Sequence, residues 1–191
     1  PDWIFEIKWD GFRSLAHVQD GVCRLISRNG NTFKSFSVLD EAIAAELTAR
    51  SAVLDGEIVC LDKHGKTQFR DLLFRRGEPR FYAFDLLQLD GEDLRYLPLI
   101  ERKQRLRSIV PKHGDRLLYC DHIEAEGEGL FRVACEHDLE GIVAKQKTAP
   151  YRTANETTWF KIRNRSYSQW IGREELFERE RGSDPDVGLW G

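Results

Sequence analysis

A lysine between an acidic residue and a glycine turn is the feature of this chain best suited to chemistry. The run Glu6-Ile-Lys8-Trp-Asp10-Gly-Phe-Arg13 otherwise has the apolar pattern of a strand. A lysine amine attacks phosphorus only when it is unprotonated, and loss of water or nearby cations favours that form. Lys8 is therefore a candidate nucleophile, although an isolated Lys-x-Asp-Gly also fits an ordinary edge-strand lysine beside a turn.

Two later segments place carboxylates within strand patterns of apolar residues. Alternation along residues 52–61 puts Asp55 and Glu57 on one face, where Glu57 could accept a hydrogen bond from a ribose hydroxyl if that face lined a cleft. In Glu140-Gly-Ile-Val-Ala-Lys145 the carboxylate is a candidate ligand of magnesium, which usually accompanies phosphates. Because simple alternation puts Glu140 and Lys145 on opposite faces, only one of them is expected to face a shared site, and Glu140 is the preferred candidate.

Paired cations characterise the last predicted strand, Trp159-Phe-Lys-Ile-Arg163. Lys161 and Arg163 point the same way beside Trp159, whereas Phe160 and Ile162 are expected to face a core. Two cations with parallel aim suit a polyphosphate, which presents several anionic oxygens. The chain has neither a Gly-rich Walker loop nor a Rossmann fingerprint, so side chains must hold the phosphates. The whole inventory matches phosphoryl chemistry on a nucleotide, where positioning and charge neutralisation dominate catalysis.

The composition allows one domain, or one large domain with a small appendage, since 41% of the 191 residues are hydrophobic. A net charge of -3 excludes nucleic-acid binding through overall basicity, so any such surface must be a local patch. The first basic cluster contains Lys145, Lys147, Arg152, Lys161, Arg163 and Arg165 against the single acid Glu156. The second contains Arg102, Lys103, Arg105 and Arg107. We interpret the second cluster as a solvated helix face.

Four cysteines, at positions 23, 60, 120 and 135, show no Cys-x-x-Cys spacing, and no secretion signal or membrane span is apparent. Reduced thiols in a cytoplasmic protein without a membrane partner are therefore expected. Cys120-Asp-His122 and Cys135-Glu-His137 could offer four zinc ligands, but their spacing is not a familiar one. The absence of methionine indicates that the natural start is not included.

The hydrophobic periodicity predicts an α+β fold of mostly antiparallel sheets with flanking helices. The first three strands, separated by Asp10-Gly11 and Asp20-Gly21, are expected to form an antiparallel meander. The expected strands are residues 3–8, 12–18, 22–27, 52–61, 81–88, 116–120, 140–147 and 158–163. The expected helices are residues 37–50, 98–110, 129–137 and 173–181, followed by an irregular end at 182–191.

Residues 3–165 resemble the covalent nucleotidyltransferases, and most of all the adenylation domain of ATP-dependent DNA ligases of the bacterial end-joining type. Five motifs of that family occur in order. They are Lys8-Trp-Asp-Gly-Phe-Arg13, Leu54-Asp-Gly-Glu57, Phe81-Tyr-Ala-Phe-Asp-Leu-Leu87, Glu140-Gly-Ile-Val-Ala-Lys145 and Trp159-Phe-Lys161-Ile-Arg163. A further family turn is similar to Ser27-Arg28-Asn-Gly30.

The resemblance implies a role for each motif, with ATP as the nucleotide and Mg²⁺ or Mn²⁺ as the metal. Lys8 would become bonded to AMP, and Glu140 would be linked to the metal. The implied nucleotide contacts are Glu6 at the adenine edge, Phe84 stacked on adenine, Glu57 at the ribose, Arg28 near the ribose and phosphate, Arg13 on the nucleotide, and Lys161 at the phosphate. Lys161, Arg163 and Lys145 would favour the neutral amine of Lys8 and neutralise developing charge, although family members often carry lysine where Arg163 stands.

By this resemblance, residues 1–170 are an adenylation domain with a nucleotide cleft, and residues 171–191 are a charged helix and tail. Ligases of this kind continue into an OB-fold domain that closes over the nucleotide, and the residues after Arg163 are too few to form one. The expected partners are ATP, nicked double-stranded DNA, and a separate OB-fold domain or end-joining protein. Two alternatives stay open: an RNA ligase or GTP-using capping enzyme with the same lysine chemistry, and a module that binds nucleotide or DNA without transfer.

Overall fold

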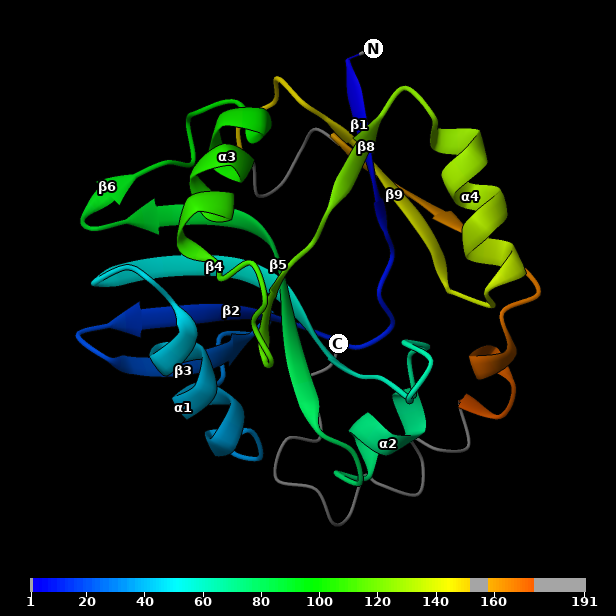
Figure 1. The fold of residues 1–191 in the computed structure, drawn as a ribbon, viewed down its shortest axis with the longest axis horizontal. Helices are drawn as coiled ribbons and strands as arrows, with labels where there is room; N and C mark the ends of the chain where they lie inside the picture. Colours follow the sequence, from blue (N-terminus) through cyan, green and yellow to red (C-terminus); the bar gives the residue numbers. More distant parts are fainter. Residues whose placement is uncertain (1, 152–157, 174–191) are drawn as a thin grey trace.

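The computed structural model describes residues 2–151 and 158–173, which form two β-sheets with helices packed on them (Figure 1). The smaller sheet has the strand order β10-β9-β1-β8, and all its neighbouring strands are antiparallel. Its strands are β1 (Trp3–Ile7), β8 (His122–Glu124), β9 (Gly141–Gln146) and β10 (Trp159–Arg163).

The larger sheet has the order β3-β2-β4-β5-β6, and β7 pairs with β5 in the parallel sense. Its strands are β2 (Phe12–Gln19), β3 (Val22–Ser27), β4 (Ser51–Cys60), β5 (Pro79–Leu89), β6 (Glu92–Asp93) and β7 (Leu117–Tyr119). The helices are α1 (Ser37–Glu46) on β3, α2 (Phe69–Leu73) on β4, α3 (Leu99–Ile109) on β5 and α4 (Gly127–Glu136) on β9, with a 3-10 helix at Ser168–Trp170. The predicted α+β class with mostly antiparallel sheets is confirmed. The short elements α2, β6 and β8 are not predicted by the periodicity.

Alternation along β2 separates the core from the functional face. Phe12, Ala16 and Val18 are buried on one side of the strand, where they join the main hydrophobic cluster. Arg13 projects from the opposite side, as period-two geometry requires. One strand therefore supports the core and delivers a cation to the other face of the sheet.

The predicted meander is correct for the β2–β3 hairpin and wrong for β1, which pairs with β9 and β8 in the other sheet. Between β1 and β2 the chain crosses from one sheet to the other. The amide of Lys8 still donates to the carbonyl of Gly141 at 2.9 Å. At Gly11 an added Cβ would lie 2.0 Å from the carbonyl oxygen of Ile58, so only glycine allows this close approach. Asp10-Gly11 is thus a crossing between sheets and not a hairpin turn.

The interpretation of the second basic cluster as a solvated helix face is wrong for Arg102 and Lys103, whose side chains are fully buried. Arg102 forms two 2.8 Å hydrogen bonds with Asp85 on β5. Lys103 pairs with Glu6 on β1 at 2.5 Å. Positions 99, 102, 103, 106 and 109 share one face of α3 at helical spacing. Arg102 and Lys103 therefore lie on the same buried face as the apolar residues of the helix. The other two cations of the cluster stay in contact with solvent.

Part of the sequence-based expectation lies outside the described residues. The predicted helix 173–181 lies there apart from Arg173, as do the irregular end 182–191 and the cluster residues Arg152 and Glu156. Within the described ranges, no helix combines the length and the apolar character that crossing a bilayer requires.

Replacing Arg102 with alanine should lower the free energy of unfolding by about 3–5 kcal/mol, because the buried Asp85 carboxylate loses its charged partner. The matched control is Arg105→Ala on the same helix, which removes a solvent-exposed ion pair with Glu92 and should cost less than about 1 kcal/mol. Urea denaturation of both variants measures the difference. Equal losses would contradict the role of the buried pair.

Candidate active site

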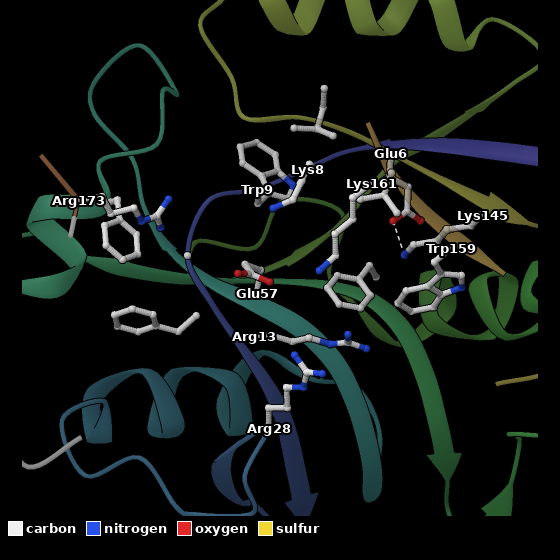
Figure 2. Close-up of a pocket in the computed structure, with 16 residues that line it drawn as sticks. Glu6, Lys8, Trp9, Arg13, Arg28, Glu57, Lys145, Trp159, Lys161 and Arg173 are labelled. Atoms are coloured by element: carbon white, nitrogen blue, oxygen red, sulfur yellow. Dashed lines mark ion pairs between the residues drawn. The ribbon is translucent and has the colours of Figure 1, made fainter. Parts of the chain in front are cut away.

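A cavity of about 260 Å³ opens between the two sheets and carries most of the predicted site residues on its walls (Figure 2). The predicted residues that line it are Glu6, Lys8, Arg13, Arg28, Glu57, Phe84, Lys145 and Lys161. Glu140 joins them through an ion pair with Lys8. Arg163 is not among the lining residues, and its guanidinium lies 5.5 Å from the ring centre of Trp170. The proposed nucleotide contact of Arg163 stays a prediction.

Glu6 is buried between two lysines at one end of the cavity. Its carboxylate lies 2.5 Å from Nζ of Lys103 and 2.6 Å from Nζ of Lys145. Burial alone would raise the pKa of Glu6, but the two ammonium groups outweigh burial and hold that pKa below its ordinary value. The ionised carboxylate therefore fixes Lys145 at the cavity wall.

Lys8 follows β1 directly, and its Nζ donates to Oε2 of Glu140 at 2.5 Å. Burial raises the pKa of Glu140, with Lys8 acting in the opposite direction. Of Glu140 and Lys145, the cavity lining includes Lys145, so the preference for Glu140 is not matched; Glu140 reaches the site through its ion pair with Lys8. Simple alternation does not extend to Glu140, because β9 begins after it. Gly141 between them has φ of 140°, and a Cβ there would lie 2.1 Å from the carbonyl oxygen of Ile162. This glycine reorients the chain so that both side chains reach the cavity region.

Two arginines enter the cavity from the larger sheet. Arg13 on β2 forms a two-point ion pair with Asp55 on β4, with distances of 3.1 and 2.7 Å. Tyr151 also donates to Asp55, at 2.9 Å. Burial opposes the charge of Arg13, but Asp55 outweighs it and raises the pKa of the guanidinium. Arg28 lines the cavity from the predicted turn after β3. In that turn the amide of Gly30 donates to the carbonyl of Ser27 at 2.9 Å.

Lys161 reaches from β10 into the cavity toward Glu57 (Figure 2). Burial, and then the positive charges of Lys8, Arg13 and Arg163, lower the pKa of Lys161, while Glu57 opposes them. Lys8, Arg13, Arg28 and Lys161 all line the same cavity. The expected clustering of positive charge near Lys8 is therefore present.

Glu57 lies on β4 and lines this cavity, so its side of the strand faces a cleft and not bulk water. Burial raises the pKa of Glu57 to about 8, helped by the charges of Glu140 and Asp10 and opposed by Lys8 and Arg13. The carboxyl group therefore carries a proton over much of the neutral pH range. In that form it can donate as well as accept a hydrogen bond.

Aromatic and apolar side chains line the end of the cavity near Lys145. Phe84 and Trp159 meet edge to face with ring centres 5.6 Å apart. Nζ of Lys145 lies 4.2 Å and 4.0 Å from these two ring centres. Val143, which the motif reading does not single out, lines the cavity from β9. This end offers the flat apolar surface that a planar base requires.

Sequence reasoning misses one cation of the cavity, Arg173. Its Nη2 donates to Oδ1 of Asp10 at 2.6 Å, and Oδ2 of Asp10 accepts a 2.9 Å hydrogen bond from Tyr167. In sequence Arg173 is the first residue of a charged stretch, and no spacing distinguishes it from the charges that follow. The contact depends on how the chain folds back after β10.

The expectation that Phe160 and Ile162 face a core is wrong, because they are 48% and 37% exposed. They alternate with Trp159 and Lys161 along β10, which is an edge strand of the smaller sheet. The strand therefore has one face on the cavity and one face in contact with solvent. Alternation alone does not tell which of the two faces is buried.

The donors around Lys8 fit a magnesium-type ion better than zinc. Glu57 and Glu140 are two carboxylates whose mutual repulsion contributes to the raised pKa of Glu57, and a divalent cation would relieve that repulsion. Mg²⁺ is usually held by one or two carboxylates together with substrate phosphates. In the described part of the chain, no group of three or more His, Cys, Asp or Glu side chains could hold a metal, so the considered zinc ligands do not converge.

Residues 1–163 match the family of the ATP-dependent DNA ligase domain, so the chain belongs to the ATP-dependent DNA ligases as their adenylation domain. The multifunctional non-homologous end joining protein LigD of Pseudomonas aeruginosa is 34% identical over 169 residues, covering 85% of this chain and 20% of that protein. A DNA ligase of Pyrobaculum calidifontis is 30% identical over 192 residues, covering 91% of this chain and 33% of the relative. The chain thus spans only a fifth to a third of the length of these relatives.

Solved structures show the same fold. A mycobacterial DNA ligase D complexed with ATP and MES matches with a TM-score of 0.71 and 30% identity, over 85% of this chain and 54% of that one. The resemblance to the adenylation domain of end-joining ligases is confirmed at the level of family and fold.

The stability difference between Glu57→Gln and the wild-type protein should depend on pH. Folded Glu57 keeps its proton up to about pH 8, whereas an unfolded glutamate loses it near pH 4.3, so the folded state binds more protons between these values. Wild-type stability should therefore fall relative to the variant as pH rises from about 5 to 8. Thermal unfolding across this range measures the effect, with Glu136→Gln on the exposed face of α4 as control. A constant difference for Glu57→Gln would contradict the raised pKa of Glu57 in the folded protein.

Proposed function

We propose that this domain transfers AMP from ATP to Lys8, and that the resulting lysyl-AMP supplies the AMP used in DNA sealing. The observation that carries the proposal is a shared cavity: Lys8 lines the same walls as Lys161, the arginines and the aromatic end. The family supports ATP as the nucleotide, as does the shared fold of a mycobacterial ligase D complexed with ATP.

In the proposed step, the lone pair of Lys8 Nζ attacks the α-phosphorus of ATP in line. A phosphorus–nitrogen bond forms, the bond from the α-phosphorus to the bridging oxygen breaks, and pyrophosphate leaves with the electron pair. As the neutral amine forms this bond, its nitrogen becomes positively charged and must lose one proton, and Oε1 of Glu140 is left for the metal ion. Glu140 Oε2, 2.5 Å from Nζ and with its pKa raised by burial, is placed to accept that proton.

The remaining residues take positioning roles in this proposal. Phe84, with Val143 on the cavity wall from β9, would hold the adenine near the Glu6–Lys145 pair. Glu57 and Arg28 would contact the ribose. Lys161, Arg13 and Arg163 would neutralise charge on the phosphates, because guanidinium and ammonium groups stabilise developing negative charge.

Mg²⁺ or Mn²⁺ fits this proposal as the divalent ion, with Glu140 as the main protein ligand and Glu57 as the second carboxylate. When bound, the ion would neutralise negative charge on the triphosphate. The protein side chains would orient the nucleotide and direct Lys8 at the α-phosphate.

For the whole protein we propose sealing of nicked double-stranded DNA in end joining, with a separate OB-fold domain or end-joining protein as partner. Residues 1–170 would be the adenylation domain, and the family match over residues 1–163 supports that boundary. A cytoplasmic location is part of the proposal. The four cysteines, all within the described residues, are free thiols, which supports a reducing compartment.

Incubation with ATP and Mg²⁺ should add one AMP to the protein, because Lys8 is the only lysine proposed to attack. Lys8→Ala and Lys8→Arg should both lower the amount of AMP adduct by at least about 100-fold, since neither offers a neutral amine at this position. Intact-mass spectrometry measures the adduct. Lys147→Ala, which removes a lysine paired with Glu124 outside the cavity wall, should leave it unchanged.

The same assay separates the alternatives. An adduct with GTP in preference to ATP would favour the capping-type enzyme, and measurable nucleotide affinity without any adduct would favour a binding module. With a preformed adduct, transfer of AMP to a 5′-phosphate at a DNA nick, and not at an RNA nick, is the outcome expected of a DNA ligase.

A further inference from the structure

Arg173 lies on the cavity wall although it comes ten residues after the last strand of the smaller sheet. Its guanidinium lies 3.8 Å from the ring centre of Phe69 and 4.9 Å from that of Trp170, and its Nη2 donates to Asp10 at 2.6 Å. The side chain is 16% exposed. A guanidinium in contact with two rings and a carboxylate is held in one orientation.

The segment that carries Arg173 is attached to the site by buried hydrogen bonds. Asn164 donates two hydrogen bonds to the turn before β9, from its backbone amide to the carbonyl of Glu140 and from Nδ2 to the carbonyl of Leu139. Tyr167 is 2% exposed, and its hydroxyl contacts both Asp10 and Thr67. Residues 164–173 are therefore attached to the site and place Arg173 on the cavity wall.

Arg173 occupies the end of the cavity opposite the base-binding end. Figure 2 shows Glu6, Lys145 and Trp159 on one side and Arg173 on the other, with Lys8 and Lys161 in between. The chain supports this order, since Glu6 and Asp10 lie two residues before and two after Lys8. Glu6 holds Lys145 and Asp10 holds Arg173, so Lys8 is flanked in the chain by the residues that anchor the two ends.

A nucleotide with its base at the Glu6 end would extend its phosphates in this direction. In an in-line displacement the leaving group lies opposite the attacking nitrogen, and its oxygens gain negative charge as the bond breaks. A guanidinium has five N–H donors, so Arg173 can keep its bond to Asp10 and still present donors to phosphate oxygens.

We propose that Arg173 binds the β- and γ-phosphates of the nucleotide, and pyrophosphate in the reverse reaction, as the leaving-group cation of Lys8 adenylation. This inference rests on the proposed function. It assigns to the segment after β10 a role in catalysis, and it makes Asp10 and Tyr167 positioning residues that hold Arg173.

The test compares ATP with AMP, because only ATP reaches the Arg173 end. In a Lys8→Ala background, Arg173→Gln should weaken ATP binding by at least tenfold and change AMP binding by less than twofold. Arg173→Lys should restore part of the ATP affinity. Isothermal titration calorimetry with each nucleotide measures these values. Arg165→Gln, an exposed arginine on the same segment outside the cavity wall, should change neither.

With Lys8 intact, Arg173→Gln should also slow pyrophosphate-driven loss of AMP from the preformed adduct by at least tenfold. Equal weakening of ATP and AMP binding, or no change in either, would overturn the assignment and show that Arg173 only holds the chain in place. Those outcomes leave lysyl-AMP formation by the wild-type protein intact. Absence of that adduct would instead refute the proposed function itself.

Discussion

A carboxylate buried between two ammonium groups fixes the arrangement of the two sheets around the cavity. Glu6 on β1 pairs with Lys103 of α3 and Lys145 of β9, and Lys103 also donates to the carbonyls of Phe84 and Cys120. Burying three charges costs several kcal/mol for each ion, and their mutual attraction offsets that cost only when every partner is in place. The cluster is therefore satisfied in one relative position of β1, α3 and β9, and that position decides where Lys8 emerges.

From this anchor, every second residue of one short segment engages a different partner. Glu6 reaches Lys103 and Lys145, Lys8 reaches Glu140, and Asp10 reaches Arg173 and Tyr167. The Glu6 contacts join β1 to α3 and β9. The Lys8 contact reaches the turn before β9, and the Asp10 contacts reach the segment after β10. Residues 6, 8 and 10 thus reach three different parts of the cavity region, although only Glu6 belongs to β1.

The sequence specifies local elements and motif residues more clearly than long-range placement. The five ordered motifs identify six residues that line one cavity, and Glu6 and the turn that carries Arg28 add two more, because their chemistry is visible in residue type and spacing. The sequence does not indicate that β1 belongs to the smaller sheet, since its partners β8 and β9 lie more than 100 residues away in the chain. The burial of Arg102 and Lys103 was accessible in principle, because they share helical spacing with Leu99 and Leu106. Arg173 had no comparable signal, since its place depends on tertiary contacts with Asp10.

The charges of the cavity explain how a chain of net charge -3 can offer so cationic a site. Four of its cations already have carboxylate partners: Lys8 with Glu140, Arg13 with Asp55, Lys145 with Glu6, and Arg173 with Asp10. Among the described residues, Lys161 and Arg28 have no such ion pair, so the unbalanced positive charge is concentrated at these two positions. A triphosphate would therefore meet Lys161 and Arg28 first, while Arg173 stays oriented by its bond to Asp10. Pairing in the free protein keeps these groups oriented and limits repulsion between them, which is the preorganisation that phosphoryl transfer requires.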